Sequence, residues 1–221
     1  MTDPVRVTRR MLLCGAVGAV SFVLVFLVVG ATRTGYSPMR HTVSAASNGP
    51  GGWVQIFNFV VTGSLMVVFA LGVRRALSPG RVSAWASSLL GVFGVALVLS
   101  GVFTTDPMLG YPPGTPVGTP TETTWQHTLH DLAGVLVFVS LPAAALVVAG
   151  HLRSIRSERR WALYSAATGS AMVVLLVLFV VAGEQESAVT GLIQRIMIVV
   201  GWAWVALIAL HLARRGTDTD R

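Results

Sequence analysis

Six long stretches of the chain consist almost entirely of apolar residues, and polar segments separate them; the stretches are 11–30, 55–73, 84–103, 129–150, 162–183 and 192–212. Each has about the 20 residues that an α-helix needs to cross roughly 30 Å of hydrocarbon. The apolar residues are continuous, whereas the strands of a membrane barrel alternate between apolar and polar positions. The pattern therefore predicts an all-α integral membrane bundle of six transmembrane helices in a single domain, residues 1–221.

The composition agrees with a membrane location. Hydrophobic residues make up 53% of the 221 residues, and charged residues make up only 11%. A soluble domain carries about 25% charged residues, so a water-soluble fold of this composition would expose very large apolar patches. The single cysteine, Cys14, lies inside the first apolar stretch, which excludes a disulfide framework.

The arginines predict the orientation in the membrane. The sequence has no lysine, and thirteen of its sixteen basic residues fall on one side of the predicted bundle: Arg6, Arg9, Arg10, Arg74, Arg75, Arg81, Arg153, Arg156, Arg159, Arg160, Arg214, Arg215 and Arg221. The other side has Arg33 and Arg40, with Arg195 just inside the last stretch. Positive charge marks the cytoplasmic side, so both termini are predicted to be cytoplasmic. The lysine-free, Ala/Val/Gly-rich composition favours a bacterial plasma membrane.

The same distribution argues against nucleic acid as a partner. A net charge of +7 is compatible with nucleic-acid binding only when basic residues gather on one soluble face. Here the arginines lie in small groups between apolar stretches. Membrane lipids are therefore the expected partners, and the oligomeric state stays open.

Polar residues in and beside the apolar stretches gather near their extracytoplasmic ends. Asp106 follows the third stretch, and the segment His127-Thr-Leu-His130-Asp131 begins the fourth; Asn58 lies in the second and Ser44 in the first outer loop. Polar side chains are costly in lipid, so their positions are informative. They predict an extracytoplasmic polar pocket between the second, third, fourth and sixth helices, with Arg195 one turn inside the last.

Two interpretations of the histidines and acids are open. In the first, His127, His130 and Asp106 bind a metal ion such as zinc, and Asp131 orients a histidine. Such a site would activate water in a hydrolase acting on a lipid, with Asp131 and Arg195 as catalytic candidates and Arg195 holding an anionic head group. In the second, the same residues form a hydrogen-bonded structural cluster, because acids near a helix start are favourable without any function.

Arg195 has its own structural interpretation. An arginine inside a membrane span needs a partner, and an ion pair with Glu184, Glu186, Asp106 or Asp131 would close the outer end of the bundle.

Histidines at the opposite ends of the bundle permit a third and weaker hypothesis. His151 and His211 lie at the inner ends of the fourth and sixth stretches, about one helix length from His127 and His130. Haem electron carriers of the membrane stack two haems in this way, but each haem needs two axial ligands. The alternative is that these histidines lie at the membrane interface without a cofactor.

Two segments resemble a known family. They are Gly35-Tyr-Ser-Pro-Met-Arg-His-Thr-Val-Ser44, followed by Phe57-Asn58, and Gly101-Val-Phe-Thr-Thr-Asp106-Pro107, followed by a Pro/Gly-rich loop and His127 to Asp131. With six spans, the chain resembles the bacterial and archaeal membrane family catalogued as domain-of-unknown-function 998. The resemblance implies the six-helix fold over nearly the whole chain and no particular activity. It also implies that Ser44, Asn58, Asp106, His130 and Asp131 occupy the positions of the family's motifs.

The favoured hypothesis is therefore a multi-pass membrane protein that binds lipid or modulates a partner through its extracytoplasmic pocket. A metal-dependent hydrolase and, more weakly, a haem electron carrier are the alternatives.

Overall fold

The computed structural model describes residues 3–77 and 80–218, and their regular structure is helical. The long helices are α1 (Pro4–Thr32), α2 (Trp53–Ala76), α3 (Arg81–Val102), α4 (Trp125–Arg153), α5 (Arg159–Glu184) and α6 (Thr190–Asp218). Two short 3-10 helices, Ser44–Ser47 and Arg156–Glu158, lie in the connections. All six long helices are long and apolar enough to cross a membrane. The predicted all-α class with six membrane-spanning helices is confirmed.

The helices extend beyond most of the predicted apolar stretches. α1 begins at Pro4, where the Asp3 side chain accepts a hydrogen bond from the Val5 N–H and so satisfies a free donor of the first turn. One predicted end was too long by one residue: Phe103 was predicted inside the third span, but it follows the end of α3. Arg221, counted in the charge pattern, lies outside the described residues.

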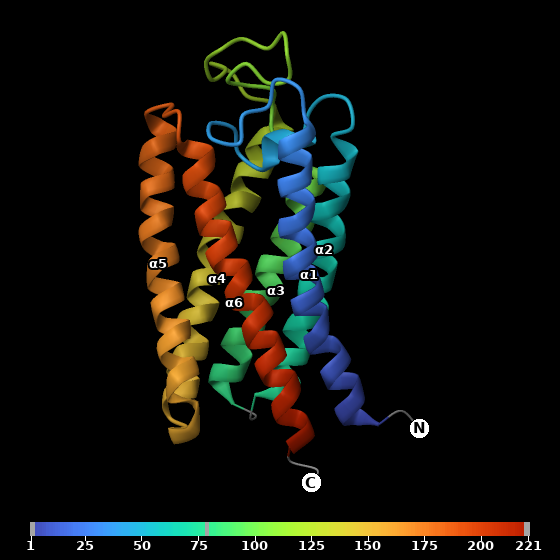
Figure 1. The fold of residues 1–221 in the computed structure, drawn as a ribbon, viewed down its shortest axis with the longest axis vertical. Coiled ribbons are helices and arrows are strands. Elements are labelled where there is room, and N and C mark those ends of the chain that lie inside the picture. Colours follow the sequence, from blue (N-terminus) through green and yellow to red (C-terminus); the bar gives the residue numbers. More distant parts are fainter. Residues whose placement is uncertain (1–2, 78–79, 219–221) are drawn as a thin grey trace.

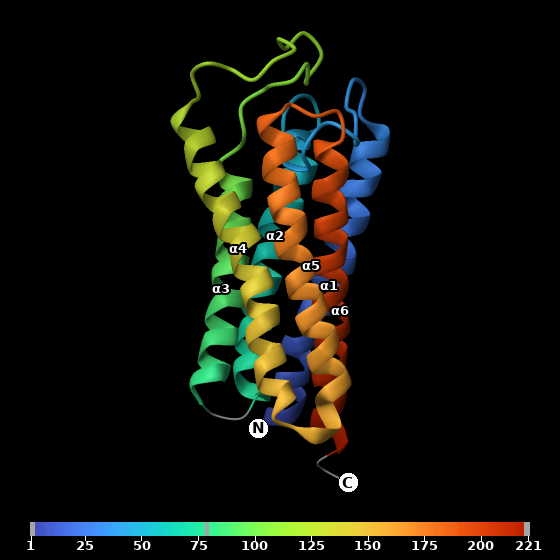
Figure 2. The same cartoon turned by 90° about the vertical axis from the view of Figure 1, so that its left-hand side faces the viewer.

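The six helices form a closed ring. Each helix packs against the next one in the sequence, and α6 also packs against α1 (Figures 1 and 2). The two termini lie at one end of the bundle, here called the terminal end. The segments 33–52 and 103–124 cover the opposite end, here called the loop end. That the terminal end faces the cytoplasm remains the prediction from the arginines.

Aromatic side chains fill the centre of the ring. Phe22 of α1 lies 4.8 Å from Trp202 of α6 and 5.6 Å from Phe59 of α2, measured between ring centroids. Trp204 is fully buried, and its indole N–H donates a hydrogen bond of 2.9 Å to Ser165 of α5. These contacts pack α1, α2, α5 and α6 around the centre of the ring, and the indole N–H of Trp204 is paired.

α2 and α3 approach each other until their backbones touch. A Cβ atom added at Gly63 would lie 2.5 Å from the Gly94 carbonyl oxygen, and one added at Gly94 would lie 2.8 Å from the Gly63 carbonyl oxygen. Only glycine permits this distance, which is the usual way that helices pack closely in a membrane.

α5 is packed unevenly along its length. Near its middle it contacts α4, since a Cβ at Gly169 would lie 3.1 Å from the Pro142 carbonyl oxygen. At the loop end Thr190 donates a hydrogen bond to the Ala182 carbonyl oxygen. Between these points, no residue from 173 to 181 is buried. α4 and α5 also separate toward the loop end (Figure 2). On this side of the ring, α5 is therefore only loosely packed against its neighbours.

Candidate functional site

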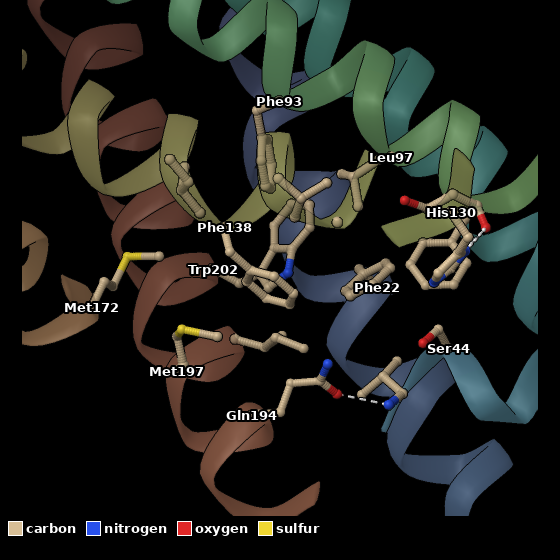
Figure 3. A pocket seen from close by; sticks show the side chains of 17 residues that line it. Phe22, Ser44, Phe93, Leu97, His130, Phe138, Met172, Gln194, Met197 and Trp202 are labelled. Atoms are coloured by element: carbon tan, nitrogen blue, oxygen red, sulfur yellow. Dashed lines mark hydrogen bonds between the residues drawn. The ribbon is translucent and has the colours of Figure 1, made fainter. Parts of the chain in front are cut away.

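A pocket lies in the loop half of the ring, and residues from all six helices line it (Figure 3). Its cavity volume is about 60 Å³, measured as the space open to the centre of a water-sized sphere, and the gaps between the lining atoms total about 600 Å³ when space open to the outside is included. Its walls are mainly apolar and include Phe22, Phe93, Leu97, Met172 and Trp202. The predicted pocket involved four helices; α1 and α5 contribute as well.

Polar groups are confined to a few positions on the pocket wall: Ser44, Ser100, His130 and Gln194. The His130 Nδ1 atom lies 2.8 Å from the Phe103 carbonyl oxygen and 3.1 Å from that of Ser100. Carbonyl oxygens only accept hydrogen bonds, so Nδ1 carries the ring proton and Nε2 is an acceptor. Within the described residues Nε2 has no hydrogen-bond partner, and it is available to a molecule in the pocket.

Gln194 supplies the complementary group. Its Oε1 atom accepts a hydrogen bond of 2.7 Å from the Val43 N–H, which fixes the amide against the first loop (Figure 3). Its NH₂ group has no partner among the residues that the structure describes, and two N–H bonds remain available. With the Ser44 hydroxyl, the pocket therefore offers both donors and acceptors.

Asp106, His127 and Asp131, which were predicted near the pocket, instead form a separate joint between α3 and α4. The His127 Nδ1 atom accepts hydrogen bonds from the Asp106 N–H (2.8 Å) and the Thr105 hydroxyl (3.0 Å). Its Nε2 atom lies 3.2 Å from a carboxylate oxygen of Asp131. The Asp106 carboxylate accepts from the Thr124 N–H (2.8 Å) and hydroxyl (2.7 Å). These bonds hold the ends of the loop 103–124 together.

This arrangement does not fit a zinc ion. Both ring nitrogens of His127 are engaged, and the His130 Nδ1 proton points to backbone carbonyls. Over residues 3–77 and 80–218, no three His, Cys, Asp or Glu side chains come together in a group that could hold a metal. The contacts agree with the hydrogen-bonded cluster, and they give the metal-dependent hydrolase no support.

The joint should make stability depend on acid pH. Burial raises the pKa of Asp106, whereas the hydrogen bonds from Thr124 and the nearby His127 lower it. The lowering effects together are larger, so the pKa of Asp106 is below its ordinary value. A carboxyl with a lowered pKa in the folded state stabilises the fold above its unfolded pKa, and this contribution is lost as the pH falls through the folded pKa. We expect the melting temperature of the wild type to fall more steeply below about pH 4 than that of Asp106→Asn.

The control is Glu122→Gln, which removes an equal charge from the same loop at an exposed position. The melting temperature of Glu122→Gln should fall with decreasing pH as steeply as that of the wild type. Thermal unfolding in detergent from pH 7 to pH 3 measures all three proteins. Parallel curves for the wild type and Asp106→Asn would show that the carboxylate of Asp106 does not hold the joint.

Arg195 is buried and binds neutral groups rather than a carboxylate. Its Nη1 atom donates to the carbonyl oxygens of Pro38 (2.7 Å), His41 (2.7 Å) and Gly191 (2.9 Å), and Nη2 donates to the Tyr36 hydroxyl. The expected ion pair with an acid is absent from these contacts, because the first loop folds inward and brings its carbonyls to the guanidinium. Arg195 therefore fastens the loop 33–52 to α6.

The two loops pack on each other above the pocket. The rings of Tyr36, His41 and Tyr111 lie with their centroids 5.1 to 5.5 Å apart. His41 accepts from the Ser37 N–H at Nδ1 and donates to the Leu109 carbonyl oxygen at Nε2. Burial lowers the pKa of His41, which agrees with this neutral tautomer. The loops thus form a covered end rather than two mobile connections.

Asn58 and His211 have structural contacts. The Asn58 amide donates to the Phe22 carbonyl oxygen (3.2 Å) and joins α2 to α1 outside the pocket. His211 lies 2.6 Å from Glu158 and stacks on Trp161 with centroids 4.2 Å apart. The haem hypothesis needs His211 as an axial ligand, but its Nε2 atom is bound to Glu158 and its ring is stacked on Trp161. The geometry therefore gives the hypothesis no support.

Comparison with known proteins identifies a family but no activity. The sequence profile of a family described as "Protein of unknown function (DUF998)" matches residues 16–211. This range contains both loops, the pocket and the joint. Neither the curated proteins nor the solved structures contain a match to the chain.

Proposed function

This chain belongs to the DUF998 family of proteins of unknown function, and from that premise we propose that its pocket binds the apolar chain of a membrane lipid. Ser44, His130 and Gln194 hold the polar end of the lipid. The protein is a multi-pass membrane protein, and its role is to bind lipid or to modulate a partner by doing so.

The separation of polar and apolar groups in the pocket carries this proposal. Binding sites for small molecules combine apolar walls with a few placed polar groups that fix the orientation of the ligand. Here the walls are aromatic and aliphatic, and the free groups are the His130 Nε2 acceptor and the Gln194 amide donor. A lipid has the same division between an apolar chain and a polar end.

The bilayer supplies a route to the pocket. The two packed loops cover the loop end, whereas the outer half of α5 has no buried residue from 173 to 181. Phe138 lines the pocket, and its ring lies 5.6 Å from that of Phe179 on α5. We propose that the lipid enters sideways between α4 and α5, past this aromatic pair.

The distribution of arginines predicts on which side of the membrane the pocket lies. With the termini in the cytoplasm, the pocket lies in the outer leaflet of a bacterial plasma membrane. The polar end of the lipid then lies under the two loops.

Gly134→Leu tests the proposal. Gly134 lines the pocket, and a Cβ added there meets nothing within 4 Å, so the leucine side chain occupies space that the lipid would fill. We expect lipid to bind at least tenfold more weakly, which corresponds to about 1.4 kcal/mol of binding free energy, and the lipid content per protein to fall accordingly. Lipid extracted from the purified protein, quantified by mass spectrometry, gives the measurement.

Gly150→Leu is the matched control. Gly150 is on the same helix, is exposed, and also has nothing within 4 Å of an added Cβ. Both substitutions raise helix propensity by a similar amount, so neither should destabilise the fold. A wild type without bound lipid, or unchanged lipid in Gly134→Leu, would refute the proposal.

A further inference from the structure

A second hollow lies at the terminal end, between the beginning of α1 and the ends of α2 and α6. It contains about 860 Å³ of empty space, counting the open part. Three arginines line the hollow, one from each helix: Arg9, Arg75 and Arg215.

The positive charge of these arginines is largely uncompensated. Arg9 has no hydrogen bond or ion pair within the described part of the chain. Arg75 contacts the Met11 sulfur at 3.0 Å, which is a weak and uncharged acceptor. Arg215 lies 3.4 Å from Glu158, but that carboxylate is also bound by His211 at 2.6 Å. Among the side chains that the structure describes, two guanidinium groups of the hollow have no anionic partner and the third shares one.

The remaining walls of the hollow are apolar. They include Val5, Leu12 and Leu212, with Pro4, Ala76 and Ala213. Arginines at the ends of membrane helices extend toward the interface and leave their stems along the apolar surface. The hollow thus has positive charge at its rim and apolar side chains on its walls. This combination is complementary to a lipid with an anionic head group, whereas a free ion would make no use of the apolar walls.

We propose that this hollow binds an anionic phospholipid, with its phosphate between Arg9, Arg75 and Arg215 and its acyl chains along the apolar walls. Planar guanidinium groups bind phosphate oxygens through two parallel N–H bonds. Basic pockets between transmembrane helices bind anionic head groups by the same chemistry. This site is independent of the proposed lipid pocket, because it selects the charge of the head group and lies at the other end of the bundle.

Lipid titration of the full-length protein in detergent tests this site. Phosphatidylglycerol and phosphatidylcholine are added separately. Bound lipid is counted by native mass spectrometry, and the melting temperature is measured in parallel. The double variant Arg9→Gln/Arg75→Gln should bind phosphatidylglycerol at least tenfold more weakly than the wild type. The control Arg156→Gln/Arg160→Gln removes the same charge from exposed positions at the same end and should stay within about twofold.

The outcomes separate the possible sources of binding. Preference for phosphatidylglycerol that is lost only in the Arg9/Arg75 variant supports the site. Equal affinity of the wild type for both lipids overturns it, and so does an equal loss in both double variants, which would indicate general surface charge. Inorganic phosphate that stabilises the protein as much as the lipid does would overturn the lipid assignment. If the double variant does not fold, Arg9→Gln alone gives the same test, because its side chain has no described contact to lose.

Discussion

Leucine at position 94 is expected to lower the free energy of unfolding by about 3 kcal/mol or more, or to prevent folding. An added Cβ at Gly94 would lie 2.8 Å from the Gly63 carbonyl oxygen and 2.8 Å from the Val67 nitrogen. Both atoms belong to the backbone of α2, so no side-chain rotation relieves the overlap. The two helices would have to move apart and lose their contacts along the interface.

Gly91→Leu provides the comparison on the same helix. It lies one turn earlier, and a Cβ added at Gly91 meets nothing within 4 Å. Leucine there should change stability by no more than about 1 kcal/mol, and in the favourable direction, because glycine is a poor helix former. Thermal unfolding in detergent distinguishes the two variants. Similar melting temperatures would mean that α2 and α3 do not pack through Gly63 and Gly94.

Arg195→Met is expected to cost about 3–5 kcal/mol of unfolding free energy. Methionine keeps a long apolar stem but donates no hydrogen bond. The carbonyl oxygens of Pro38, His41 and Gly191 would lose their donor inside the protein. We further expect the loop 33–52 to detach from α6 before the bundle unfolds. Hydrogen exchange and limited proteolysis of this loop, together with thermal unfolding, measure the effect.

Arg40→Met removes a charge from the same loop without disturbing these contacts. Its described hydrogen bond, to the Val117 carbonyl oxygen, is 3.5 Å long, and its loss should cost less than about 1 kcal/mol. If the two methionine variants are equally stable, the buried hydrogen bonds of Arg195 contribute little and another contact must hold the loop.

The six helices were predictable because lipid leaves the backbone almost no alternative. In hydrocarbon every N–H and C=O group must be paired within its own segment, so a long apolar stretch is sufficient evidence for a helix. The helix ends were less predictable. α1 begins at Pro4, seven residues before the apolar stretch, because capping by Asp3 and helix propensity continue a helix into water where hydropathy gives no signal.

The candidate site was only partly predictable. Polar residues in a membrane span are costly wherever they lie, so the sequence identified His127 and His130 together. Their spacing places them on one side of α4 but does not specify their partners. The structure directs His127 to the α3 joint and His130 to the pocket. Gln194 was not among the residues predicted to line the pocket, although its position beside Arg195 was a signal. Apolar wall residues such as Phe22 and Met172 have no sequence signal that separates a pocket from a core.

The uneven packing of α5 has a consequence for how quickly the pocket exchanges its contents. No side chain of the segment 173–181 is fully buried, and only Leu175, Leu176 and Phe179 are half-buried, so displacing the segment uncovers less apolar surface than displacing a core segment of the same length. Segments of this kind open with free energies far below that of global unfolding. The contacts at Gly169 and Ala182 limit the movement to this stretch. For a lipid that enters by the proposed route between α4 and α5, exchange would then depend on the local stability of one stretch of α5, and a very stable bundle would be compatible with rapid exchange.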